Sequence, residues 1–238
     1  MDADVEPLAR LLLRSAGIAS SYIEGISAPI VDVVLAEQRL SSAEDGAAGW
    51  VDSNLAGVTR AIATSKTRAA LSIEMLCEWH RILVNGSPIP EHYIGSVRQE
   101  QGCIGGTSPL GANLVTAPAD RPPELLDDRV KYANRRDLDP VAQAAICHAQ
   151  FEVSHPFGDG NGRVGRVFVA WALTRRLALV VPLPGSVAIA ADVGGHSSGL
   201  VLFRLGDHGP WIRWFADTVA NGNRAQRSLI SSVTRINH

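Results

Sequence analysis

The segment that decides the fold runs from His155 to Arg166 and reads HPFGDGNGRVGR. Glycine tolerates positive φ and lets other groups approach the backbone closely, so successive N–H groups can point into one concavity. Such a concavity attracts anions. After the histidine, three glycines alternate with polar residues: Gly158, Asp159, Gly160, Asn161, Gly162 and Arg163.

An apolar run with helical spacing follows this loop, from Val164 to Leu173. It predicts that the loop opens into a helix that continues to about Leu179. The unpaired N–H groups and the dipole at a helix N-terminus favour negative charge. Arg163 and Arg166 are three residues apart and share one helical face. Together these features predict a cradle for a polyphosphate.

Two common phosphate-binding loops are excluded by the surrounding sequence. No Gly-Lys-Ser/Thr follows the glycines, which excludes a P-loop. The glycines follow a predicted helix at 140–153, whereas a dinucleotide-binding fingerprint follows a strand.

The segment resembles the Fic family signature HPFx(D/E)GNGRxxR at every specified position. The resemblance implies a mostly α-helical Fic-type bundle around a central signature loop and helix at 155–179. It also implies one β-hairpin, the flap, at about 95–118, where a target protein docks by strand addition. The implied activity is transfer of AMP from ATP to a Ser, Thr or Tyr hydroxyl of a protein, with release of pyrophosphate.

Each polar residue of the loop has a chemistry that suits this reaction. His155 titrates near neutral pH and is expected to deprotonate the attacking hydroxyl. Asp159 is the acidic residue of the loop, and we expect it to bind the Mg²⁺ that accompanies ATP. The predicted nucleotide-binding residues are Gly158, Gly160, Asn161, Gly162, Arg163 and Arg166, with Arg163 on the outer phosphates. Asn161 can also fix the loop through its amide, and the apolar Phe157 is expected to anchor it in the core.

A second motif ends the predicted helix at 6–24. Ser20 and Glu24 are four residues apart on one face, and Gly25 is a natural helix stop. The segment SSYIEG resembles the inhibitory motif (S/T)xxxE(G/N) of many Fic proteins. That resemblance implies that Glu24 pairs with Arg166 where the γ-phosphate must lie. The alternative is an ordinary helix that ends with a solvated glutamate.

The rest of the chain predicts further helices and two short strands. We expect helices at 51–65, 72–83, 211–219 and 224–236, strands at 96–99 and 113–116, and coil at 182–195. Asp139 is the expected N-cap of the helix at 140–153. His80 and His148 are expected to be packed histidines of helix stripes rather than metal ligands. Residues 1–45 form the predicted N-terminal inhibitory segment and residues 46–238 the core domain.

Composition limits the partners and the compartment. The net charge is −2 and 19% of residues are charged, which gives no footprint of nucleic-acid binding. The three cysteines lack CxxC spacing, as expected in a reducing compartment. The N-terminus lacks a signal-peptide pattern, and arginines and prolines interrupt the apolar region at 167–191, which excludes a membrane span. The predicted compartment is the cytoplasm.

Several alternatives stay open. The same site can run in reverse, as a de-AMPylase in which Glu24 orients water, or serve as a non-catalytic nucleotide-sensing or partner-binding module. Beyond Pro184 the sequence departs from the family pattern, which leaves the choice of nucleotide base open. The target protein, self-modification and homodimer formation are not specified by the sequence.

Overall fold

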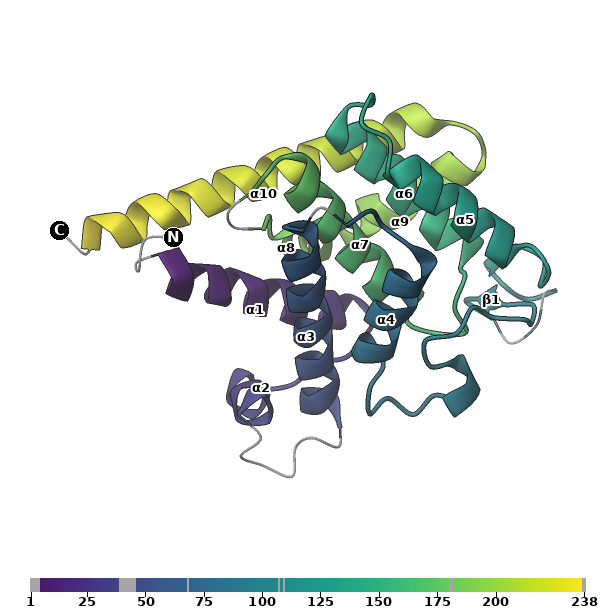
Figure 1. The fold of residues 1–238 in the computed structure, drawn as a ribbon, viewed down its shortest axis with the longest axis horizontal. Coiled ribbons are helices and arrows are strands. Elements are labelled where there is room, and N and C mark those ends of the chain that lie inside the picture. Colours follow the sequence, from purple (N-terminus) through teal and green to yellow (C-terminus); the bar gives the residue numbers. More distant parts are fainter. Residues whose placement is uncertain are drawn as a thin grey trace.

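The computed structural model describes residues 5–38, 46–67, 69–106, 108, 110–179 and 182–236. These residues form a helical bundle with one small antiparallel hairpin, which confirms the predicted fold class (Figure 1). The proposed boundary at residue 45 adjoins residues 39–45, which lie outside the described residues. The helices are α1 (Val5–Ile23), α2 (Ile30–Glu37), α3 (Ala47–Ser65), α4 (Ile73–Leu83), α5 (Pro122–Ala133), α6 (Pro140–Ser154), α7 (Asn161–Arg176), α8 (Gly185–Ala191), α9 (Val193–Arg204) and α10 (His208–Ile236).

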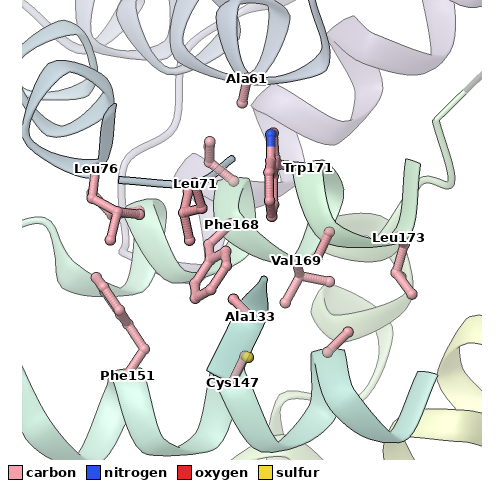
Figure 2. Packing of buried hydrophobic residues seen from close by; sticks show 14 of the residues in the cluster. Ala61, Leu71, Leu76, Ala133, Cys147, Phe151, Phe168, Val169, Trp171 and Leu173 are labelled. Carbon is pink, nitrogen blue, oxygen red and sulfur yellow. The ribbon is translucent and has the colours of Figure 1, made fainter. Parts of the chain in front are cut away.

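Helix α7 is the centre of the bundle and is packed by α3, α4 and α6. Its apolar residues face several neighbours at once, as expected for a helix that is apolar on most sides. Phe168 on α7 meets Phe151 on α6 edge to face, with ring centroids 6.2 Å apart (Figure 2). Trp171, one turn further on, lies 6.1 Å from the ring of Trp79 on α4. This core fixes the two helices that flank the loop at 155–160.

Helix α6 begins and ends as the sequence predicts. The carboxylate of Asp139 accepts hydrogen bonds from the backbone N–H groups of Val141 and Ala142, at 3.0 and 2.8 Å. Its last residue is Ser154, and His155 caps it in the left-handed conformation. The first residue of the loop is therefore held by the end of a core helix.

Helix α1 packs mainly against α3 and α8. Gly17 permits the close approach, because a Cβ there would lie 3.3 Å from the backbone of Leu55. Asn54 of α3 donates to the Gly17 carbonyl at 2.7 Å and to the Ser21 hydroxyl at 3.2 Å. The helix ends at Ile23 and Gly25 follows with φ +74°, as predicted for a helix stop. The packing carries the end of α1 towards the start of α7.

The hairpin pairs β1 (Cys103–Ile104) with β2 (Leu114–Val115), with Cys103 opposite Val115. The predicted strand at 96–99 is wrong. Val97 makes a single antiparallel bridge to Phe157 of the loop, and β1 begins later in the chain. The bond from the Arg98 N–H to the Pro156 carbonyl belongs to this bridge, and the Arg98 side chain donates to the His155 carbonyl.

The C-terminal third is more helical than predicted. Residues 185–191 form α8, so the expectation of coil throughout 182–195 is wrong. The small residues of this segment give no helical periodicity, which is why it was missed. The helices predicted at 211–219 and 224–236 are parts of the single helix α10, which tolerates Gly222 in its interior. Three further helices, α2, α5 and α9, were not predicted.

Among the described residues, no single helix is both long and apolar enough to cross a membrane. The bent pair α8 and α9 reaches that length and composition only when the two helices are taken together.

Candidate active site

The loop between α6 and α7 is closed by one side chain. The Asn161 Oδ1 atom accepts a hydrogen bond from the Phe157 N–H at 2.9 Å, and its Nδ2 donates to the Phe157 carbonyl at 2.8 Å. Gly160 precedes the helix with φ +71°, a conformation that favours glycine. The first N–H groups of α7 therefore lie at the edge of a tight turn, as the sequence predicts, and Asn161 fixes that turn through its amide.

Phe157 anchors the loop in the core. Its side chain is fully buried and stacks on the His80 ring, with centroids 4.2 Å apart and planes 7° apart. Phe157 therefore lies in the core, where the predicted anchoring role places it, and that role stays a prediction.

His80 is a buried histidine that holds the loop from the other side. Its Nδ1 accepts the Gly95 N–H at 2.9 Å, so this nitrogen carries no proton. Its Nε2 then donates to the Asp159 carbonyl at 3.0 Å. Burial lowers the pKa of His80 to about 4, which keeps the ring neutral. As predicted, His80 is a packed, buried residue.

His155 lies at the entrance of the loop with φ 49° and ψ 65°. Its Nδ1 is 3.1 Å from the Glu152 carbonyl, which can only accept, so Nδ1 carries the proton and Nε2 keeps its lone pair. Burial is the main cause that lowers the pKa of His155, and the neutral ring is favoured. The residue borders a recess of about 120 Å³ that Cys103 of the hairpin and Tyr93 also line. A neutral imidazole with an unprotonated Nε2, on a residue that borders a recess, has the form of a general base.

Asp159 is exposed at the tip of the loop. One carboxylate oxygen, Oδ1, accepts the Gly160 N–H at 2.6 Å. Gly158 beside it packs against Tyr93, because a Cβ at Gly158 would lie 2.6 Å from that ring. Within the described part of the chain, no three His, Cys, Asp or Glu residues come together as a metal cage.

The two arginines of the signature have different partners. Arg163 is buried, and its Nη1 donates to the Leu83 carbonyl at 3.2 Å. Arg166 bonds instead to the end of α1. Its Nη2 donates to Glu24 Oε1 at 2.7 Å and to the Ser20 carbonyl at 2.9 Å, and its Nε donates to the Ser20 hydroxyl at 2.9 Å.

Glu24 therefore does not point away into solvent as an ordinary helix end would. A Cβ on Gly162 would lie 2.3 Å from Glu24 Oε1, so the carboxylate lies directly against the first turn of α7. The structure brings together Ser20, Glu24, Gly162 and Arg166, and the contact between Glu24 and Arg166 is the one that the resemblance implies. His155 and Asp159 lie in the loop before α7, and Arg163 lies in the first turn of α7.

Residues 70–173, which include this loop, α6 and most of α7, match the Fic/DOC family. The chain carries a Fic/DOC family domain. It is 31% identical over 156 residues to protein adenylyltransferase fic-1 of Caenorhabditis briggsae, a match that covers 64% of this chain and 28% of that protein. The chain thus spans little more than a quarter of that relative's length.

Two solved structures share the fold of the Fic domain. A Fic family protein from Desulfovibrio desulfuricans superposes with a TM-score of 0.74 at 24% identity, and covers 94% of this chain and 66% of that one. A Fic domain containing signaling protein from Bacteroides thetaiotaomicron superposes with a TM-score of 0.75 at 16% identity, over 96% and 91% of the two chains.

A buried polar cluster lies beneath the Fic signature. His148 is fully buried, as predicted for a packed histidine, and its Nε2 is 3.0 Å from the Nε2 of His196. Its Nδ1 is 3.7 Å from Glu152 Oε1. Burial raises the pKa of Glu152 to about 7, with Arg166 opposing the rise and Glu24 adding to it. Gly165 leaves room for this carboxyl group, since a Cβ there would lie 2.4 Å from Glu152 Oε1.

Sequence reasoning missed two residues of the Fic site. Glu152 lies on α6 one turn before His155. Helical spacing is the signal in the sequence that could have placed it near the loop. Arg98 is a buried arginine at the base of the hairpin. Its partners are backbone carbonyls, which leave no signal in a sequence.

Proposed function

We propose that this Fic domain is an autoinhibited protein adenylyltransferase that moves AMP from ATP to a Ser, Thr or Tyr hydroxyl of a protein. The observation that carries the proposal is the position of His155. Its unprotonated Nε2 belongs to a residue that borders the recess beneath the hairpin, next to a loop that leads into a helix N-terminus. The relative named protein adenylyltransferase fic-1 supports the choice of reaction.

In this reaction, the chain's own groups position the phosphates and move one proton. The backbone N–H groups at the start of α7 hold the α- and β-phosphates, because an uncapped helix N-terminus favours anions. Arg163 contacts the outer phosphates. His155 Nε2 takes the proton of the target hydroxyl, whose oxygen then bonds to the α-phosphorus. The bond from that phosphorus to the β-phosphate oxygen breaks, and pyrophosphate leaves with the electron pair.

The residues present fit a Mg²⁺ ion that arrives with the nucleotide. Mg²⁺ typically binds one or two carboxylates together with phosphates and several waters. The exposed Asp159 offers such a carboxylate, with Oδ1 oriented by the Gly160 N–H. Asp159 would hold the ion, which neutralises charge on the phosphates when bound.

Autoinhibition is proposed from the contacts of Glu24. Its carboxylate occupies the place against α7 where the signature predicts an anion, and it engages the Arg166 guanidinium at 2.7 Å. A third phosphate cannot use Arg166 while this contact persists. ATP must therefore displace Glu24 or bind in a pose that does not present the α-phosphorus to the target.

The target is proposed to lie along the hairpin, with its hydroxyl in the recess beside His155. Val115 of β2 is exposed, and an extended segment can add to a free strand edge by backbone hydrogen bonds. The same recess would accept a segment of a second copy of the chain, so self-modification provides an assay that needs no identified target.

The test is incubation with ATP labelled on the α-phosphate and Mg²⁺, followed by intact mass. We compare wild type, Glu24→Gly and Glu24→Gly/His155→Ala. Glu37→Gly is the matched control, because Glu37 pairs with Arg14 of α1 at 2.6 Å without touching the signature. A mass gain of one AMP in Glu24→Gly, absent from the double variant and low in the control, is the expected result.

The opposite outcomes separate the parts of the proposal. No adduct in any variant, with ATP binding retained, contradicts the transferase. Equal labelling of wild type and Glu24→Gly removes the autoinhibition, and labelling that survives His155→Ala removes the base.

A further inference from the structure

Arg98 is a buried cation, and within the described ranges of the chain its hydrogen bonds go to backbone carbonyls. Only 3% of its surface is exposed. Its Nε donates to the His155 carbonyl at 2.6 Å, and its Nη1 to the Glu100 carbonyl at 2.5 Å. Its Nη2 donates to the carbonyls of Ala117 at 2.6 Å and Ser154 at 3.2 Å. Arg98 has no carboxylate partner among the ion pairs of the described residues.

These four carbonyls belong to three different segments. Glu100 leads into the hairpin, Ala117 follows its return, and Ser154 and His155 end α6. The Arg98 backbone N–H adds a bond to the Pro156 carbonyl at 2.9 Å. The planar guanidinium of Arg98, whose donors have a fixed geometry, therefore links the segments before and after the hairpin to His155.

The backbone of His155 needs such support. Its left-handed conformation costs a residue other than glycine about 1–2 kcal/mol. The N–H of His155 is held by the Phe151 carbonyl at 2.9 Å, and its carbonyl is held by Arg98. The ring then depends on this backbone, because Nδ1 bonds only to the nearby Glu152 carbonyl.

We propose that Arg98 is the positioning residue of the transfer reaction, which sets His155 and the hairpin in one fixed relation. The inference rests on the proposed function, because it assumes that His155 is the base. It implies that a target held by the hairpin is presented to Nε2 at a distance fixed by this one side chain.

The charge of Arg98 affects a measurable quantity, the pKa of His155, which a purely structural role would not change. The groups that act on the pKa of His155 are burial and Arg98, which lower it, and the Glu152 carbonyl, Glu24 and Asp159, which raise it. Removing the Arg98 charge must therefore raise the pKa of His155, while a lysine at 98 must leave it nearly unchanged.

The experiment uses the full chain with Glu24→Gly as parent and adds Arg98→Lys, Arg98→Gln or the control Arg129→Gln. Arg129 is equally buried on α5 and is not among the charges that act on His155. We measure kcat and the KM for ATP in self-labelling, and titrate the His155 Cε1–H resonance by NMR, assigned with His155→Ala.

We expect both Arg98 variants to lose roughly 100-fold in kcat, the effect of a misplacement of about 1 Å. The KM for ATP should change by less than about threefold, because the bonds of Arg98 go to the carbonyls of the hairpin, of the end of α6 and of Pro156, and not to the residues predicted to hold the phosphates. Only Arg98→Gln should raise the pKa of His155, and Arg129→Gln should change neither quantity.

The inference is overturned if Arg98→Lys keeps the parent kcat, or if Arg129→Gln shifts the His155 titration as much as Arg98→Gln does. A parent that forms no adduct counts against the proposed function instead. In that case the titration still decides whether Arg98 acts on His155, because it needs no turnover.

Discussion

Replacing Phe157 with alanine tests whether the loop is held by the core. The ring is fully buried, and it stacks on His80 with centroids 4.2 Å apart. Truncating a buried phenylalanine to alanine costs about 3–5 kcal/mol of unfolding free energy. For a chain of this length, each kcal/mol lowers the melting temperature by about 2–4 °C. We therefore expect a fall of about 6–20 °C.

The same change should weaken ATP binding. The variant keeps the backbone N–H and C=O that Asn161 binds to close the loop, but it loses the buried ring that fixes their position. The matched control is Phe168→Ala, a ring that is 1% exposed and packs against Phe151 and Trp171. Urea unfolding by circular dichroism measures stability, and calorimetry in the Glu24→Gly background measures ATP affinity. We expect comparable losses of stability and a loss of affinity of about tenfold or more only at Phe157. Equal ATP affinity in the two variants would refute the reasoning, as would a Phe157→Ala destabilisation below about 1 kcal/mol.

Two further predictions concern the groups around Arg166. Ser20→Ala removes a buried hydrogen bond to a charged group, worth about 1.5–3 kcal/mol, and should raise self-labelling by about tenfold or more in a chain that keeps Glu24. An unchanged labelling rate in a destabilised Ser20→Ala protein would contradict the inhibitory role of that contact. The pKa of Glu152 is about 7 in the folded chain, whereas in the unfolded chain this carboxyl group loses its proton near its ordinary pKa. Between these two pKa values, the wild type should therefore lose roughly 1.4 kcal/mol of unfolding free energy per pH unit as the pH rises. Glu152→Gln should flatten that slope when urea unfolding is compared at pH 5 and pH 7, and a slope identical to that of the wild type would show that Glu152 does not titrate in this range.

The sequence predicts best those features in which the residues themselves carry the geometry. Alternating glycines, the anchor Phe157 and the helical spacing after Gly162 define the loop and the start of α7. Ser20 lies in the last turn of α1 and Glu24 follows its last residue, so the end of the helix places them together. Their contact with Arg166 is a long-range one, and family resemblance was needed to predict it.

Features set by tertiary contacts were predicted poorly. Arg98 lies in a Gly- and Pro-rich stretch, and nothing local indicates that its partners are carbonyls up to 57 residues away. Helix α8 consists of small residues without an apolar stripe, so packing against α1 and α10 determines it rather than periodicity. The helices expected at 211–219 and 224–236 are one continuous helix, α10, which runs through Gly222.

The contact between Glu24 and Arg166 joins residues 142 positions apart in the chain. Glu24 follows the end of α1, and Arg166 lies on α7. Under the proposed function, the resting activity is set by the fraction of molecules without this contact, and not by the catalytic groups themselves. It equals the share of molecules in which the end of α1 has left its place against Asn54 and Leu55. An undocking free energy of about 3 kcal/mol leaves roughly one molecule in a hundred competent at any moment. This fraction would increase on heating, on proteolysis near Gly25, or when a protein binds the exposed Tyr22. Each of these would then activate the chain without contacting the active site.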